Sequence, residues 1–197
     1  MVSNRLVCGV GRTGSGPHKA TRKHGCMAYS IWYAMLSRCY MEDSKRVARN
    51  RYYAGCSVSD EWLDFQSFAE WYLSNHIPGF HLDKDILVPG NKIYSAETCG
   101  FVPVAINVCL SHSRRKNRSY DLPTGVSFCS VNKKYQSTIS INGRSISLGL
   151  FGSSDLARSA YLKKKKEHLL SLAEQYRPMI TEEIYKALLI FPIEGEL

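Results

Sequence analysis

The sequence lacks the features that mark membrane, secreted and zinc-binding proteins. No apolar run in its 197 residues approaches the length of a membrane span, so no contact with a membrane is predicted. Its first ten residues do not join a cationic stretch to a long apolar one, so no secretory signal is predicted. The seven cysteines never occur as C-x-x-C, which argues against both a disulfide framework and a zinc site. We therefore expect reduced thiols, no zinc and a cytoplasmic location.

Acidic residues are also fewer than basic residues. Lysine and arginine number 26 against 17 aspartate and glutamate residues, which gives a formal net charge of +9. Cationic side chains that reach phosphate groups release condensed counterions, so this balance favours a polyanionic partner. The same excess is typical of a basic surface that only keeps a protein in solution. Charge alone does not decide between these two interpretations.

Composition predicts five segments in an α+β protein. Residues 1–28 are rich in glycine and basic residues, which predicts a flexible cationic arm or a disordered terminus. Residues 29–112 contain aromatic residues at helical spacing, and residues 113–123 form a basic linker. A domain over 124–176 and an amphipathic tail over 177–197 follow. The linker supplies four candidate DNA contacts, Arg114, Arg115, Lys116 and Arg118.

The segment 124–176 has the pattern of a small sheet followed by a helix. Residues 135–141 alternate between apolar and polar positions, and Asn142-Gly143 is the strongest short hairpin signal in the chain. Residues 144–150 supply the returning strand, and Ser153 or Ser154 caps a long helix. Alternation predicts that Tyr135, Ile139 and Ile141 face this helix. We expect a three-stranded antiparallel sheet with one packed helix.

Four short motifs in this segment carry a resemblance. They are G-V-S-F, K-K-Y-Q-S-T-I-S-I-N-G-R, S-L-G-L-F and A-R-S-A-Y, in that order along 125–161. Together they resemble the DNA-binding domain of the Apetala/ethylene-response-factor family, in which a three-stranded sheet lies in the major groove and a helix backs it. The resemblance implies binding to double-stranded DNA; the alternative is a small domain with a basic face that binds nothing. The candidate contacts are Lys133, Lys134, Gln136, Thr138, Ser140, Arg144 and Ser147.

A second resemblance covers residues 80–107. The run H-L-D-K-D-I-L-V-P-G-N-K-I-Y-S-A-E-T-C-G-F-V-P-V-A-I-N is similar to the ββα-metal module of HNH homing endonucleases. More widely, residues 30–160 resemble phage proteins that pair this module with an Apetala-type domain. In an active module, a histidine activates water, a loop asparagine orients it, and a divalent ion stabilises the leaving oxygen. The resemblance therefore implies Mg²⁺ or another divalent ion as cofactor.

The catalytic positions of that module fall on Asp83, Lys84, Asp85 and Asn91, and its metal ligands fall on Asp85 and Asn107. Lys84 stands where the general base is expected. A lysine is a cationic donor near neutral pH and cannot replace an imidazole unless its pKa is strongly depressed. The alternative is a degenerate scaffold on which Asp83, Lys84 and Asp85 form ion pairs or contact DNA.

The residue at position 81 is a histidine close to these groups. On a regular strand it would share a face with the two aspartates and lie opposite Lys84. A carboxylate-bound hydrolytic centre therefore stays open as an alternative.

Three functions are consistent with these patterns. The first is a phage-type protein that binds double-stranded DNA at the nucleoid without cutting it. The second is a metal-dependent HNH-type homing endonuclease or nickase, so enzymatic activity stays open. The third is a protein–protein adaptor or an inhibitor of a host complex. Because Lys84 stands where the general-base histidine is expected, the sequence favours the first function, DNA binding without cleavage.

Overall fold

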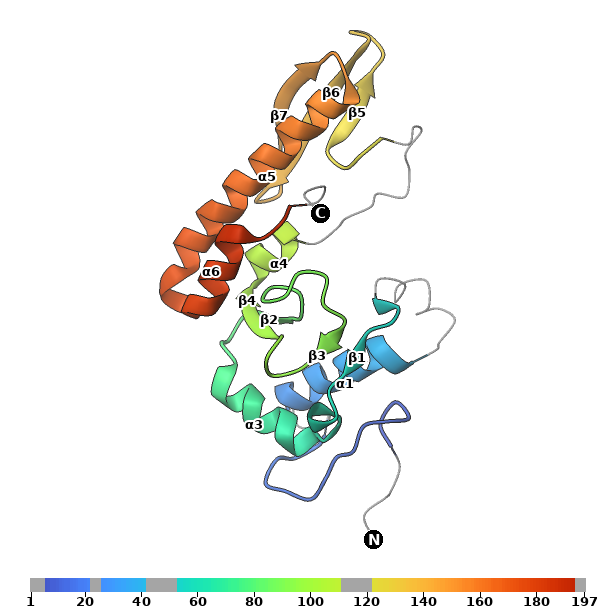
Figure 1. Cartoon of the computed structure of the whole chain (residues 1–197), viewed down its shortest axis with the longest axis vertical. Helices are drawn as coiled ribbons and strands as arrows, with labels where there is room; N and C mark the ends of the chain where they lie inside the picture. Colours follow the sequence, from blue (N-terminus) through green and yellow to red (C-terminus); the bar gives the residue numbers. More distant parts are fainter. Residues whose placement is uncertain (1–5, 22–25, 42–52, 111–121, 194–197) are drawn as a thin grey trace. The chain divides into compact units, whose positions relative to one another are not determined.

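The computed structural model describes residues 6–21, 26–41, 53–110 and 122–193 (Figure 1). The chain is α+β and divides into two compact units, Met1–Val102 and Pro103–Leu197, here called the N-terminal and C-terminal units. The basic segment 113–123, predicted to separate two domains, lies almost wholly outside the described residues. The division instead precedes the short helix α4, Val104–Leu110, because α4 packs against the long helix of the C-terminal unit. Within the described residues, no helix is long and apolar enough to cross a membrane.

The N-terminal unit combines short helices with two small sheets. Its elements in chain order are α1 (Met27–Tyr40), β1 (Ser57–Val58), η2 (Glu61–Leu63), α3 (Phe65–Asn75), β2 (Phe80–Asp83), β3 (Ile93–Tyr94) and β4 (Gly100–Pro103). Strands β1 and β3 pair in parallel, and β2 pairs with β4. The Asp64 side chain accepts the N–H of Gln66 at 2.8 Å and so begins α3.

Aromatic side chains form the core of this unit. Trp32 of α1 and Trp62 of η2 are almost completely buried, and the Trp32 indole N–H donates to the carbonyl of Trp62 at 2.7 Å. The rings of Phe65 and Phe68 are fully buried beside them. Large buried rings remove much apolar surface from water, and the indole hydrogen bond satisfies the one polar atom of Trp32. The periodic aromatic residues of the sequence therefore serve the core.

The described part of the predicted flexible arm, residues 6–21, lies against this core. The Arg12 N–H donates to Leu63 and the Arg12 carbonyl accepts from Phe65, both at 2.8 Å. Gly11 leaves room for the aromatic core, since a Cβ there would lie 2.4 Å from Leu36. The Gln66 amide donates to the carbonyls of Thr13 and His18 at 2.9 and 3.1 Å. Backbone pairing therefore fixes a segment whose composition predicted mobility. Residues 1–5 and 22–25 of the predicted arm lie outside the described residues.

The C-terminal unit contains the predicted sheet and helix. After α4 come β5 (Val126–Cys129), β6 (Lys134–Ile141), β7 (Arg144–Phe151), α5 (Ser154–Tyr176), η3 (Arg177–Met179) and α6 (Glu182–Ile190). The three strands are antiparallel in the order β5-β6-β7, and α5 packs across them (Figure 1). Asn142 and Gly143 have φ of +51° and +76°, as a type I′ turn requires, and Ser153 caps α5. The predicted tail is helix α6, which packs against α5.

Gly125 explains part of the A-R-S-A-Y motif. It has a φ of +82°, and a Cβ at this position would lie 2.0 Å from the ring of Tyr161. Arg158 stacks on the same ring at 5.2 Å and donates to the carbonyl of Thr124 at 2.8 Å. The first strand of the sheet is thus held against α5 by close backbone approach, which only glycine permits.

Candidate nucleic-acid interface

The loop after β2 holds most of the residues expected to be catalytic. Strand β2 ends at Asp83, so Lys84 and Asp85 lie in the loop, where strand alternation with His81 does not apply. Asp83 Oδ1 accepts the backbone N–H groups of Asp85 and Ile86, both at 2.8 Å. This is the local turn that aspartate favours, because a short side chain reaches the backbone two residues ahead. Burial raises the pKa of Asp83, against the lowering effect of these hydrogen bonds.

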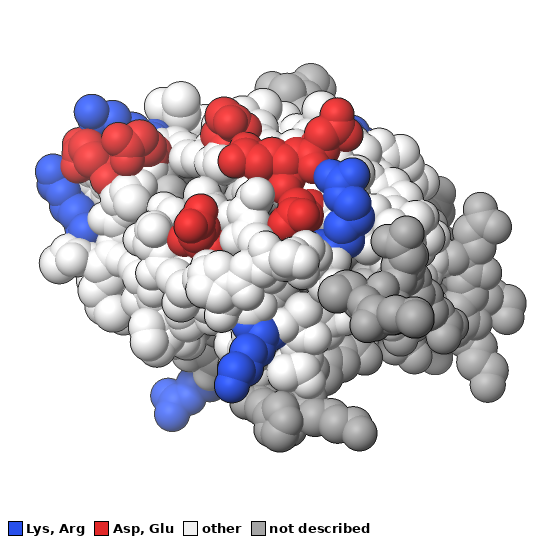
Figure 2. All heavy atoms as spheres, turned by 90° about the horizontal axis from the view of Figure 1, so that it is seen from below, with Lys and Arg blue, Asp and Glu red and all other residues white. Residues whose placement is uncertain are grey.

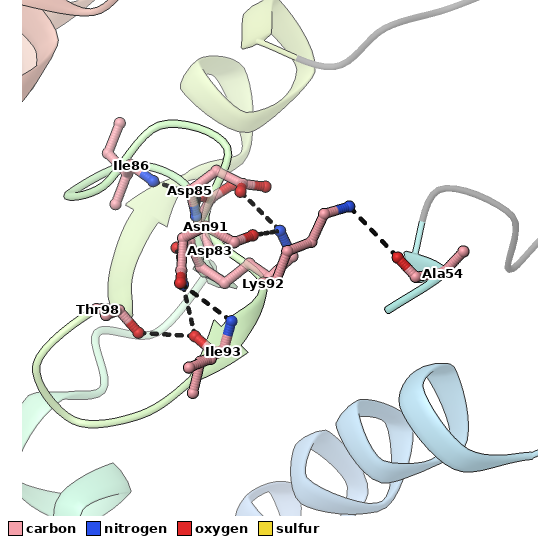
Figure 3. A network of polar contacts seen from close by, with 9 residues as sticks. Ala54, Asp83, Asp85, Ile86, Asn91, Lys92, Ile93 and Thr98 are labelled. Carbon is pink, nitrogen blue, oxygen red and sulfur yellow. Dashed lines mark hydrogen bonds and ion pairs between the residues drawn. The ribbon is translucent and has the colours of Figure 1, made fainter. Parts of the chain in front are cut away.

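Lys84 is the centre of the loop. Its side chain is only 8% exposed, and Nζ donates to Asp85 Oδ1 at 2.6 Å and to the carbonyl of Asn91 at 2.5 Å. The Asn91 amide donates in return to the carbonyls of Lys84 and Ile93, and its Oδ1 accepts the N–H of Ile93 (Figure 3). These reciprocal bonds join the two ends of the 84–91 loop. Lys84 and Asn91 therefore have a clear structural role.

These side chains do not fit a catalytic divalent ion. The ammonium of Lys84 lies against Asp85, the carboxylate that would have to bind the metal, and a cation so close opposes a second one. Asp83 and Asn91 already bond to the backbone of the loop. Asn107 lies on α4. In the part of the chain that the structure describes, no three His, Cys, Asp or Glu residues are grouped as metal ligands.

Two cysteines are close enough to this loop to interact with its charges. Burial raises the pKa of Cys39 to about 12 and that of Cys99 to about 12, while the charge of Lys84 acts on both in the opposite direction. A thiol with a raised pKa stays protonated at neutral pH and is a poor nucleophile and metal ligand. These thiols are therefore best understood as part of the packing.

The sheet of the C-terminal unit has one buried and one open face. Ser137 and Ile139 of β6 are buried on the side of α5, so the positions between them point the other way. Tyr135 and Ile141 share the buried side, as alternation predicted. We call the open side the outer face; by strand pairing it consists of Ser127, Cys129, Lys134, Gln136, Thr138, Ser140, Ser145, Ser147 and Leu150.

Five of the predicted DNA contacts lie together on the outer face. Lys134, Ser140 and Ser147 are exposed there, and Gln136 and Thr138 are half-buried. Thr138 lies opposite Ser147 on the neighbouring strand. Their amide, hydroxyl and ammonium groups therefore form one continuous polar surface.

Two further predicted contacts lie at the turns. Lys133 is exposed in the β5–β6 turn with a φ of +48°. Arg144 is exposed beside the Asn142-Gly143 turn, and its pairing with Ile141 places it on the side of Ile139. Neither belongs to the outer face. Arg114, Arg115, Lys116 and Arg118 lie outside the described residues.

Leu150 is an outer-face residue that the sequence pattern missed. Gly149 pairs with Ser137 and Ser147 pairs with Thr138, so Leu148 is an extra residue in a β-bulge. The bulge reverses the alternation along β7 and turns Leu150, 42% exposed, to the side opposite the buried Ile139. Gly149 has a φ of +124°, which glycine adopts readily. In the sequence, Gly149 inside an otherwise alternating strand is the feature that indicates this bulge.

No protein-family model, curated protein or solved structure matches the chain. The case for function therefore depends on the geometry of its own residues.

Charge is not spread evenly over the surface. Figure 2 shows a face on which acidic side chains gather in several groups, some of them with lysine or arginine side chains beside them. In the N-terminal unit, Asp60, Glu61 and Asp64 lie at the starts of η2 and α3, and Glu70 lies within α3. Acidic groups repel the phosphate backbone of nucleic acids, whereas none of the outer-face positions is acidic. The outer face is the better candidate for contact with a polyanion.

Proposed function

We propose that this chain binds double-stranded DNA through the outer face and does not cut it. The observation that carries the proposal is the composition of that face on a three-stranded sheet whose other side is covered by α5. A β-sheet of this size fits the major groove of B-DNA, where hydroxyl and amide groups can bond to base edges. The resemblance to the Apetala-type domain supports the same mode of binding.

The cations near the sheet have a separate role in this proposal. Lys133 and Arg144 are exposed at its two ends, and Lys134 is exposed at the start of its middle strand. Contacts to phosphate fix the position of a protein on the duplex, while contacts to base edges specify the sequence. We assign these three side chains to phosphate and the hydroxyl and amide groups to the bases.

The absence of cleavage follows from the environment of Lys84. Its ammonium is bound by Asp85 and the Asn91 carbonyl, where the HNH resemblance requires a base that can accept a proton from water. In this proposal the ββα-like segment is a scaffold, and its loop is stabilised by an internal cation. The loop then needs no bound ion to keep its shape.

Two measurements on the full chain test this proposal. Fluorescence anisotropy with a labelled duplex should show affinity that falls steeply with salt, by about 0.9 log units per log unit of salt for each neutralised phosphate. Binding that is absent or independent of salt would contradict the DNA-binding part. Supercoiled plasmid incubated with Mg²⁺ or Mn²⁺ at saturating protein should stay intact. Nicking that disappears in both Asp85→Ala and Asn91→Ala would contradict the scaffold part.

A further inference from the structure

The centre of the outer face combines an amide and an aliphatic side chain. Gln136 of the middle strand lies directly opposite Leu150 on one side and Ser127 on the other. Side chains directly opposite one another on a sheet have Cβ atoms about 5 Å apart, so Gln136 and Leu150 can contact neighbouring bases. Leu150 is the only aliphatic side chain among the described outer-face positions, and 42% of its surface is exposed. Its position depends on the bulge at Leu148 and Gly149.

The two side chains match the major-groove edge of an A·T pair or step. A glutamine amide can donate to N7 and accept from N6–H₂ of adenine, because it carries both kinds of group side by side. A leucine makes no hydrogen bonds, and the one apolar group that B-DNA presents in the major groove is the C5-methyl of thymine. In a G·C pair, the amino group of cytosine is a hydrogen-bond donor, and Leu150 has no atom that could accept from it.

The centre of the outer face also has no arginine or lysine to read guanine. The commonest specific contact to guanine is an arginine or lysine bonded to O6 and N7 together. None of the outer-face positions is an arginine, and its lysine, Lys134, lies at the first position of β6 beside the turn. Arg144 lies on the other side of the sheet by its pairing with Ile141.

We propose that the outer face reads at least one A·T pair in its target, with Gln136 on adenine and Leu150 on the thymine methyl. This inference rests on the proposed function, because it concerns the sequence preference of the same surface. Ser127 and Thr138 flank the pair and complete the polar contacts.

The test starts with selection of binding sites by the full chain from a library of randomised duplexes. Selected sites should share an A·T position, at which thymine is then replaced by uracil and adenine by 7-deazaadenine. Removal of the thymine methyl should weaken binding about fourfold, the value of one buried methyl or methylene group. Loss of N7 should weaken binding about fivefold or more, from the lower end of bidentate base discrimination.

Two variants assign these effects to their residues. Leu150→Ala should lose sensitivity to uracil, and Gln136→Ala should lose sensitivity to 7-deazaadenine. Ser159→Ala, an exposed change on α5 and outside the outer face, should keep both sensitivities.

The outcomes separate this inference from the proposed function. Salt-dependent binding with selected sites that share only G·C positions, or that are indifferent to both base analogues, would overturn the inference and leave DNA binding intact. Sensitivity that persists in Leu150→Ala and Gln136→Ala would also overturn it, because other residues would then read the bases. No binding to any duplex in the library would overturn the proposed function itself. The base-analogue measurements use the unaltered protein, so they hold even if a variant folds poorly.

Discussion

Replacement of Lys84 by methionine tests the internal cation of the 84–91 loop. Methionine fills similar space but removes the ammonium that bonds to Asp85 and to the Asn91 carbonyl. The Asn91 carbonyl is part-buried, and the loss of its donor costs about 1–3 kcal/mol where water does not replace that donor. The carboxylate of Asp85 is 42% exposed, so water can replace its partner and this bond adds little. We therefore expect the N-terminal unit to lose about 1–3 kcal/mol of stability.

Tryptophan fluorescence makes this measurement specific to one unit. The chain's three tryptophans, at 32, 62 and 71, all lie within Met1–Val102. Urea unfolding followed by their emission should give a lower midpoint for Lys84→Met with an unchanged slope. Lys92→Met is the matched control, because Lys92 is exposed and its Nζ bonds to Ala54 at a long 3.4 Å. The same small change in both variants, or a stabilised Lys84→Met protein, would refute the role given to this ammonium.

Two further predictions concern packing. Gly125→Ala should destabilise the C-terminal unit by about 1–3 kcal/mol more than Gly143→Ala. Both glycines have positive φ, but only at Gly125 would the added Cβ strike Tyr161. Far-UV circular dichroism in urea should show the difference in stability between the two variants. Equal losses of stability would contradict the contact between Gly125 and Tyr161. Burial against Tyr72 lowers the pKa of His76, so the folded state disfavours its protonated form, and the N-terminal unit should lose stability as pH falls below about 6.5. His76→Phe should reduce this loss in tryptophan-monitored urea unfolding at pH about 5 relative to pH about 8, and an unchanged loss would assign it to other groups.

Local chemistry explains which parts of the fold could be predicted. Asn142-Gly143 determines its turn through backbone preferences of two adjacent residues, and Ser153 caps α5 through a bond three residues away. Alternation along β6 placed Ile139 in the core because the extra residue of the bulge, Leu148, belongs to β7 and β6 itself is continuous. These features depend on few residues, all close in sequence.

The features that sequence missed depend on distant partners. Leu150 faces outward only because β7 gains one residue relative to β6, which pairing reveals and alternation does not. The loop around Arg12 is ordered by backbone bonds to Leu63 and Phe65, far along the chain. For the loop after β2, sequence identified Lys84 and Asn91 as belonging together through the HNH resemblance. Their reciprocal hydrogen bonds, which give them a structural role, are visible only in the structure.

The central claim is that the outer face contacts DNA, and two charge reversals test it most directly. Lys134→Glu and Lys163→Glu change the net charge equally, and both lysines are exposed in the C-terminal unit, but only Lys134 lies on the outer face. In anisotropy titrations with one duplex, Lys134→Glu should weaken binding about tenfold or more and reduce the salt slope by about 1, as loss of a phosphate contact does. Lys163→Glu should leave affinity and slope close to those of the unaltered protein. Equal losses in the two variants, or a larger loss for Lys163→Glu, would contradict the outer face as the DNA-binding surface.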